Sequence, residues 1–117
     1  MSNRDLAITL CDTLAAHPLH PTIDCVEIAT RFLDQVGDGF CEYILPSPAA
    51  QQEFRVRQRG SWHPFVYHAV FVLTNEVYDP YWLAHPVSQH QYLDDLQAAN
   101  PHVDLVWQPD LPPGYIR

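Results

Sequence analysis

The chain has 117 residues, of which 47% are hydrophobic and 17% are charged. This balance is typical of a single globular domain, which we expect to span residues 1–117, and it excludes a disordered tail. The 14 acidic and 6 basic residues give a formal net charge of -8. Because so acidic a surface repels nucleic-acid phosphates and anionic lipids, we expect neither nucleic acid nor membrane as a partner.

The N-terminal segment and the cysteines bear on the cellular compartment. Residues 1–17 are polar and lack a long apolar core, so we expect neither a signal peptide nor a membrane anchor. No later run reaches the roughly 18 apolar residues of a spanning helix. Cys11, Cys25 and Cys41 are odd in number and widely spaced, which does not indicate a disulfide framework. The prediction is a cytoplasmic location; secretion that reads no N-terminal signal stays open.

The first segment has the spacing of a helix. Leu6, Leu10 and Leu14 recur every four residues and predict a helix over about residues 3–16. The run HPLHP at residues 17–21 ends it, because a residue that precedes proline is held out of the helical conformation.

A second helix is expected from residue 22 or 24 to residue 36. Asp24 and Glu27 have the spacing of a capping box, and Gly37 is a suitable C-terminal stop. The apolar stripe of this helix consists of Ile28, Ala29, Phe32, Leu33 and Val36.

The middle of the chain alternates extended runs with turn signals. Strands are predicted over residues 40–45, 54–59, 67–73 and 76–79. Only Thr74-Asn75 separates the last two runs, and so short a gap indicates a hairpin.

A further helix and strand are expected near the C-terminus. Ser88 and Gln91 repeat the capping-box spacing, and Tyr92 and Leu96 belong to a helical apolar face. Residues 103–107 are interpreted as a last strand. This order predicts an α+β domain, in which N-terminal helices pack on a small, mostly antiparallel sheet and a further helix lies near the C-terminus.

Cys25 falls in the first turn of the second predicted helix. The partial positive charge and unpaired amides of a helix N-terminus stabilise a thiolate and can bind an oxyanion that forms beside it. Cys25 is therefore a candidate nucleophile. It also shares the helix face of Ile28, Ala29 and Phe32, so a buried core cysteine is the alternative interpretation.

The expected hairpin brings His68 and Asp79 onto one face of the sheet. If the turn is centred on Thr74-Asn75, Leu73 pairs with Glu76, and Asp79 becomes a diagonal neighbour of His68 with Cα atoms roughly 7–8 Å apart. A slip of one residue would place the two side chains on opposite faces. In the expected register the carboxylate can orient the imidazole through its far nitrogen. A strand-start histidine and a turn aspartate without a joint role are the alternative.

Three blocks of the sequence resemble the cysteine, histidine and aspartate blocks of the papain-like cysteine hydrolase superfamily. They are DCVEIATRFL at 24–33, YHAVFVL at 67–73 and EVYDPYW at 76–82. The resemblance is strongest to small bacterial papain-fold toxin domains and to transglutaminase-like and NlpC/P60-like hydrolases, and it covers about residues 22–83. It implies a papain-like fold, in which the helix that begins with the cysteine packs on the sheet that supplies the histidine and the aspartate.

The resemblance also implies roles for these residues: Cys25 is the nucleophile, His68 the general base and Asp79 the acid that orients the imidazole. The implied activity is thiol-dependent attack on an amide or related acyl group of a protein or peptide. A peptidase, an amidase, a protein glutamine deamidase and an acyl transferase all fit this chemistry. No cofactor is implied.

Further residues are expected at the cleft. In papain-like enzymes a glutamine shortly before the cysteine completes the oxyanion hole; it has no counterpart here, and His20 or His17 is the candidate substitute. Tyr81 and Trp82, at the end of the third block, are expected to shield the histidine–aspartate pair from water or to line the cleft.

Other interpretations stay open. Histidines 17 and 20, 63 and 68, and 85 and 90 form pairs that could join a cysteine in a zinc site, but adjacent prolines explain most of them as loop residues, and no metal is expected. The alternating Arg55, Arg57 and Arg59 are interpreted as a solvated strand face. The alternative function is a non-catalytic protein-interaction module that retains the fold.

Overall fold

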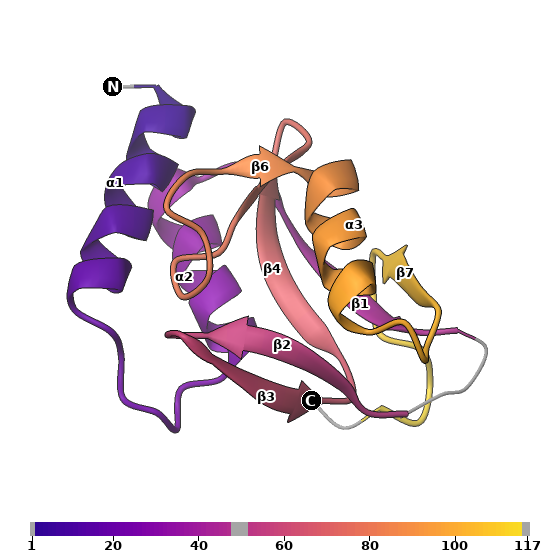
Figure 1. Ribbon diagram of the computed structural model, residues 1–117. Helices are drawn as coiled ribbons and strands as arrows, with labels where there is room; N and C mark the ends of the chain where they lie inside the picture. Colours follow the sequence, from indigo (N-terminus) through magenta and orange to yellow (C-terminus); the bar gives the residue numbers. More distant parts are fainter. Residues whose placement is uncertain (1, 48–51, 116–117) are drawn as a thin grey trace.

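The computed structural model describes residues 2–47 and 52–115. Within these residues the chain has the α+β architecture that the sequence predicts, with helices covering an antiparallel sheet (Figure 1). In chain order the elements are α1 (Asn3–Ala16), α2 (Cys25–Val36), β1 (Phe40–Pro46), β2 (Phe54–Gln58), β3 (Ser61–Phe65), β4 (His68–Leu73), β5 (Glu76–Tyr78), β6 (Val87–Ser88), α3 (Gln89–Ala99) and β7 (Leu105–Gln108).

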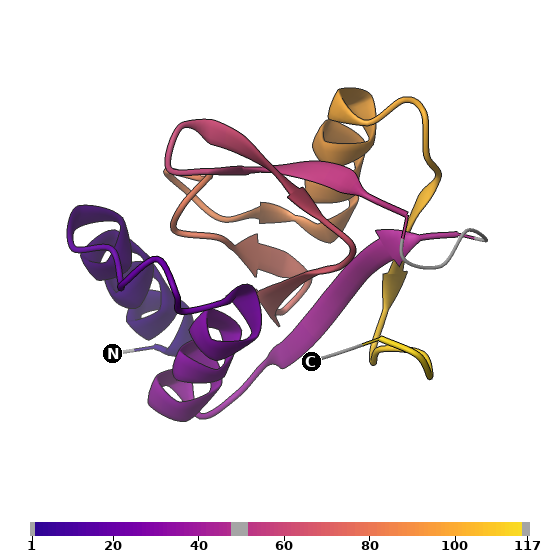
Figure 2. The same ribbon diagram turned by 90° about the horizontal axis from the view of Figure 1, so that it is seen from below.

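The main sheet contains five strands in the order β6-β5-β4-β1-β7, and each neighbouring pair is antiparallel. β4 lies at the centre, and all six of its residues are buried. α1 and α2 lie on one side of the sheet and α3 on the other (Figure 2). The central strand is therefore covered on both faces. Among the described residues, no helix combines the length and apolar character needed to cross a lipid bilayer.

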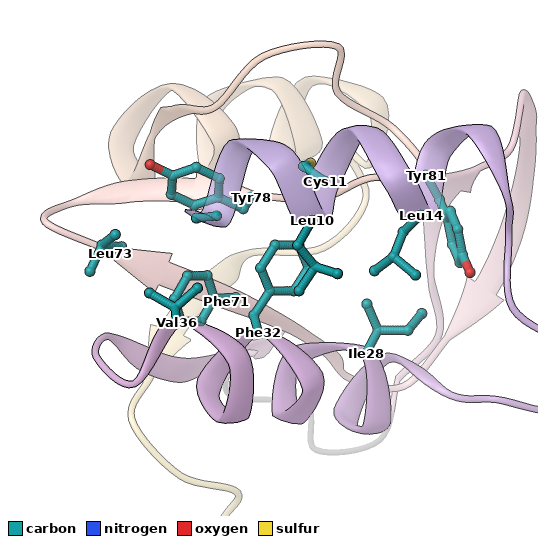
Figure 3. Close-up of a cluster of buried hydrophobic side chains, with 11 residues drawn as sticks. Leu10, Cys11, Leu14, Ile28, Phe32, Val36, Phe71, Leu73, Tyr78 and Tyr81 are labelled. Atoms are coloured by element: carbon teal, nitrogen blue, oxygen red, sulfur yellow. The ribbon is translucent and has the colours of Figure 1, made fainter. Parts of the chain in front are cut away.

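Alternate residues of β4 contribute to hydrophobic clusters on opposite faces of the sheet. Phe71 points toward the two N-terminal helices and stacks on Phe32 of α2, with ring centroids 5.1 Å apart (Figure 3). Val70 belongs to the cluster on the α3 side. Because side chains alternate along a strand, the side chain of His68 lies on the same face of the sheet as Val70, and that of Ala69 lies on the same face as Phe71.

The cap of α2 and the hairpin turn lie where the sequence predicts them, although β4 begins at His68 and not at residue 67, and β5 ends at Tyr78 and not at residue 79. The Asp24 carboxylate caps α2 by accepting the backbone N–H of Glu27 at 2.9 Å. Leu73 pairs with Glu76 across the β4–β5 turn. Thr74 and Asn75 form that turn with φ of 49° and 65°, as a two-residue hairpin requires.

A second, two-stranded sheet, formed by β2 and β3, differs from the sequence prediction. β2 ends at Gln58 and not at residue 59, because Arg59 and Gly60 have φ of 53° and 84° and form the turn into β3. The sequence does not predict β3, since four of its five residues are exposed and it contains Pro64. Such a strand shows neither alternation nor an apolar run, and proline is tolerated only at a sheet edge. β7 begins at Leu105, two residues later than expected.

The side-chain amide of Asn100, the C-cap residue of α3, holds this β2–β3 hairpin against the helix. Asn100 is fully buried; its Oδ1 accepts the Arg55 N–H at 2.7 Å and its Nδ2 donates to the Arg55 carbonyl at 2.8 Å. The same Nδ2 also donates to the Leu96 carbonyl at 2.9 Å. At the other end of the hairpin, the Arg59 N–H donates to the Tyr81 carbonyl at 2.7 Å. Asn100 thus takes the place of a neighbouring strand.

We expect Asn100→Ala to lower the free energy of unfolding by about 2 kcal/mol, because it removes the three hydrogen bonds of a fully buried amide and leaves the backbone groups of Arg55 without these partners. Urea denaturation measures the change. The control is Asn3→Ala, which removes an exposed 3.4 Å contact with Asp38 and should change the free energy by less than about 0.5 kcal/mol. Equal losses in the two variants would contradict the role of Asn100.

Candidate active site

Cys25 is the first residue of α2 and is partly buried, as the helix N-terminus prediction requires. Its Sγ accepts a hydrogen bond from the backbone N–H of Ala69 at 3.4 Å. Ala69 lies near the start of β4, before the residues of this strand that pair with β5, which are Phe71 to Leu73. The sulfur therefore lies next to the residue that follows His68. It also lies close to the amides of the first helical turn, which have no partner within an α-helix.

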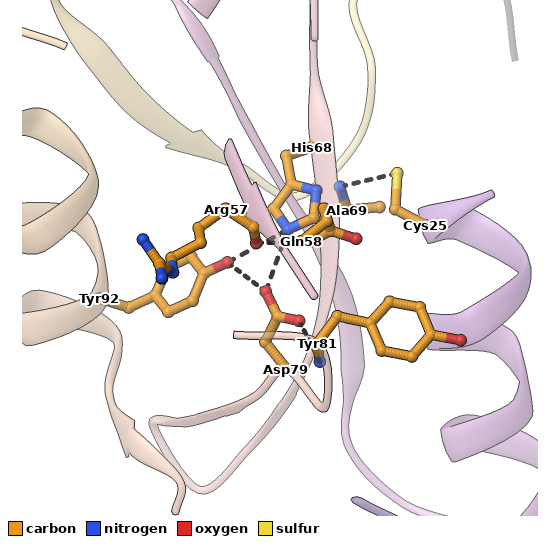
Figure 4. Close-up of polar contacts among 8 residues, drawn as sticks. All are labelled: Cys25, Arg57, Gln58, His68, Ala69, Asp79, Tyr81 and Tyr92. Carbon is orange, nitrogen blue, oxygen red and sulfur yellow. Dashed lines mark hydrogen bonds and ion pairs between the residues drawn. The ribbon is translucent and has the colours of Figure 1, made fainter. Parts of the chain in front are cut away.

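His68 and Asp79 contact each other in the buried interior. His68 Nε2 lies 3.3 Å from Asp79 Oδ2, and the two residues are 2% and 5% exposed (Figure 4). The register Leu73↔Glu76 places the two on one face, as expected from the sequence. The carboxylate contacts Nε2, the ring nitrogen that lies away from Cys25.

Two further donors hold the Asp79 carboxylate. The backbone N–H of Tyr81 donates to Oδ1 at 3.2 Å, and the Tyr92 hydroxyl donates to Oδ2 at 2.6 Å. The Tyr92 oxygen also lies 3.1 Å from His68 Nε2. The sequence identifies Tyr92 only as part of an apolar helix face. The helical spacing of apolar residues does not indicate that the Tyr92 hydroxyl contacts Asp79, at the end of the β4–β5 hairpin.

The second ring nitrogen of His68, Nδ1, is buried and has no hydrogen-bond partner within the described part of the chain. Figure 4 shows it on the side of the ring that faces Cys25. Burial opposes a charge on the imidazole, but the Asp79 hydrogen bond and the nearby Cys25 sulfur outweigh it and raise the pKa of His68 to about 9. The imidazole is thus placed between a carboxylate and a sulfur, and both favour its protonated form.

A cavity of about 10 Å³ lies between these groups, lined among others by Cys25, His68 and Asp79. This is close to the smallest volume that holds one water molecule. Gln58, at the end of β2, also lines the cavity, and its side-chain amide donates to the Arg57 carbonyl at 2.9 Å. No sequence signal identifies Gln58, since it comes from a hairpin outside the main sheet.

The two aromatic residues after Pro80 have different environments. The Tyr81 ring extends away from His68 (Figure 4), and its hydroxyl accepts the Leu19 N–H at 2.9 Å. Its contribution to the site is therefore the backbone N–H on Asp79, and not the side chain that the sequence suggested. The half-buried Trp82 packs edge-on against Tyr92 with ring centroids 5.0 Å apart, and it does not line the cavity beside Cys25.

The histidines proposed for the oxyanion hole lie elsewhere. His20 is exposed, and its Nδ1 lies 2.9 Å from the Thr22 hydroxyl. His17 is the exposed C-cap of α1. Neither lines the cavity beside Cys25.

Neither the remaining cysteines nor the arginines line the cavity beside Cys25. All three cysteines are thiols, and burial of Cys11 in the α1–α2 core raises its pKa to about 12. The Arg57 guanidinium lies 5.8 Å from the Trp62 ring centroid and that of Arg59 lies 5.2 Å from the Tyr81 ring centroid. Within residues 2–47 and 52–115, no three His, Cys, Asp or Glu side chains are grouped so as to hold a metal ion.

Comparison with protein-family models, with curated proteins and with solved structures finds no match for this chain. No residue role is therefore transferred from a relative, and the function proposed below depends on the positions of the chain's own side chains.

Proposed function

We propose that the protein is a papain-like, thiol-dependent amide hydrolase or acyl transferase. Cys25 is the nucleophile, His68 the general base and acid, and Asp79 the group that orients the imidazole. The observation that supports this most strongly is the position of His68, with Asp79 on Nε2 and Cys25 on the side of Nδ1. A buried histidine between a carboxylate and a helix-terminal thiol is the arrangement that activates a cysteine for acyl transfer.

In the proposed reaction, Cys25 Sγ gives its proton to His68 Nδ1, and the thiolate attacks the carbonyl carbon of the substrate. The carbonyl oxygen becomes an oxyanion, which the backbone N–H of Cys25 at the start of α2 can stabilise. The imidazolium then protonates the leaving amine as the carbon–nitrogen bond breaks, leaving a thioester on Cys25. Water or another nucleophile, deprotonated by His68, releases the acyl group and restores the thiol.

Gln58 is the proposed second donor of the oxyanion hole. It lines the same cavity as Cys25 and His68, and a side-chain amide N–H is the kind of donor that supplements a helix amide in this task. This assignment replaces His20 and His17, both of which lie outside the cavity.

The substrate of the proposed enzyme is a protein or peptide amide, and peptide hydrolysis, side-chain deamidation and acyl transfer share the chemistry above. One observation favours the alternative of a non-catalytic protein-interaction module: the cavity beside Cys25 is small, at about 10 Å³. Reactivity of the thiol distinguishes the two, because an interaction module has no need of an activated cysteine.

We expect iodoacetamide to alkylate Cys25 at least about 100-fold faster than Cys11 near pH 6. The helix N-terminus and the Ala69 N–H stabilise the Cys25 thiolate, whereas the Cys11 thiol has a pKa of about 12 and lies in the core. Intact-mass measurements and peptide mapping over time give the rates for each cysteine, with the partly buried Cys41 as an internal comparison. Equal rates for the three thiols would contradict the proposal.

A small activated ester extends this test to turnover. p-Nitrophenyl acetate should form a thioester on Cys25 that hydrolyses in the native protein and leaves the thiol free for a second cycle. An interaction module would either not react or keep a stable thioester. Release of ammonia from glutamine side chains of a denatured protein substrate then tests deamidation.

A further inference from the structure

Tyr92 has an unusual position for a residue of an apolar helix face. It is fully buried in α3, yet its hydroxyl contacts both the carboxylate and the imidazole of the candidate site. Its ring lies nearly parallel to that of His68, at 13°, with centroids 6.5 Å apart. Trp82 and Trp107 pack on the same ring. The phenol is therefore held in one place by its neighbours.

The contact distances determine where the protons lie. A tyrosine hydroxyl has one proton to donate, and the 2.6 Å contact with Asp79 Oδ2 uses it. Burial and the Asp79 charge raise the pKa of Tyr92 well above its usual value, so the phenol keeps that proton. Toward His68 Nε2, 3.1 Å away, the Tyr92 oxygen can then only accept.

The Asp79 carboxylate is also only an acceptor, at 3.3 Å from the same nitrogen. Two acceptors converge on Nε2, and this nitrogen must therefore carry a proton. In the neutral ring, Nδ1 is then left with a lone pair on the side that faces Cys25. The Tyr92 oxygen makes the shorter of the two contacts.

We propose that Tyr92 is a positioning residue of the candidate site: with Asp79 it holds the proton of His68 on Nε2 and so keeps Nδ1 as the base toward Cys25. This inference rests on the proposed function for its catalytic meaning. The position of the proton itself can be measured without any substrate.

Long-range ¹H–¹⁵N NMR of histidine-labelled protein tests the proton position. The Cys25→Ala variant is used, because it removes the sulfur that favours the charged ring, and spectra are recorded where His68 is neutral. We expect the proton on Nε2. In Cys25→Ala/Tyr92→Phe, the ratio of the Nε2–H to the Nδ1–H form should fall about fivefold, as loss of one ordinary hydrogen bond would cause. A proton on Nδ1 in the single variant, or a ratio unchanged by Tyr92→Phe, would overturn the inference.

Alkylation of Cys25 provides a second readout. At pH 7, Tyr92→Phe alone should react with iodoacetamide about fivefold more slowly than the native protein, because loss of an acceptor on Nε2–H destabilises the imidazolium that pairs with the Cys25 thiolate. Trp107→Phe is the matched control: it removes the indole hydrogen bond to the Gln89 carbonyl and reduces the ring area that packs on Tyr92, but it leaves the Tyr92 hydroxyl in place. Its rate should stay within twofold of native, even if its melting temperature falls.

The outcomes separate this inference from the proposed function. A protein that shows the Nε2–H form and its dependence on Tyr92, but hydrolyses no ester or amide, supports the role of Tyr92 and contradicts the enzyme. A protein that turns over while Tyr92→Phe alters neither the proton position nor the alkylation rate contradicts the role of Tyr92 alone.

Discussion

Replacing Cys25 or His68 with alanine is expected to abolish ester and amide hydrolysis, with turnover reduced by at least about 10⁴-fold in each variant. In the proposed reaction, Cys25→Ala removes the nucleophile, and His68→Ala removes the base that activates it. Asp79→Asn keeps both reacting groups and should retain more activity than either, although it replaces an acceptor of His68 Nε2 with an amide. Initial rates on p-nitrophenyl acetate measure all three variants.

Melting curves of the same variants show whether a loss of activity is caused by unfolding of the protein. Cys25 is partly buried and small, so Cys25→Ala should cost at most about 1 kcal/mol of unfolding free energy. Cys41→Ala is the control for loss of a partly buried thiol, and it should keep full activity. A Cys25→Ala protein that is destabilised but as active per folded molecule as the native protein would show that Cys25 is a core residue.

Stability should fall as the pH rises from about 6.5 to about 9. The folded protein holds a proton on His68 up to a pKa of about 9, whereas the unfolded chain loses it near the ordinary value of 6.5. Unfolding therefore releases a proton in this window, and the free energy of unfolding decreases with pH. The stabilisation is fully present below pH 6.5 and is lost above pH 9, with a total of about 3 kcal/mol.

Urea denaturation at half-unit pH intervals measures this slope. Asp79→Asn should flatten most of it, since the carboxylate is a main cause of the raised pKa of His68. The titratable groups that face this imidazole are those of Asp79, Cys25 and Tyr92. His90→Ala is the control, because His90 lies at the surface, 3.2 Å from Asp94. A slope that is unchanged in Asp79→Asn would contradict the coupling between His68 and Asp79.

The parts of the fold that the sequence predicts well are those set by local chemistry. The Asp24 cap and the Gly37 stop define α2 through contacts a few residues apart. The two-residue turn at Thr74-Asn75 fixes the hairpin register, and the register in turn places His68 beside Asp79. The triad candidates could therefore be identified before any tertiary contact was known.

The remaining site residues depend on tertiary packing, which a local pattern does not contain. In the sequence, Tyr92 has the spacing of the apolar residues of α3. Only the packing of α3 against the sheet brings the Tyr92 hydroxyl to Asp79. Gln58 reaches the cavity because Asn100 and the Arg59–Tyr81 contact fix the β2–β3 hairpin at both ends. The side chain of Tyr81 turns toward Leu19, a direction that its place after Asp79 and Pro80 does not determine.

The small cavity also affects the affinity that the proposed enzyme can have for a substrate. A space of about 10 Å³ is close to the smallest that holds one water molecule, and a substrate acyl group that occupies it would need a wider conformer. If that conformer makes up about 1% of the molecules, the apparent dissociation constant is about 100-fold larger than the intrinsic one. A high KM would then reflect the rarity of the open conformer and not poor complementarity to the substrate. Any partner that favours the open conformer would raise the catalytic efficiency of the proposed enzyme without contacting Cys25, His68 or Asp79.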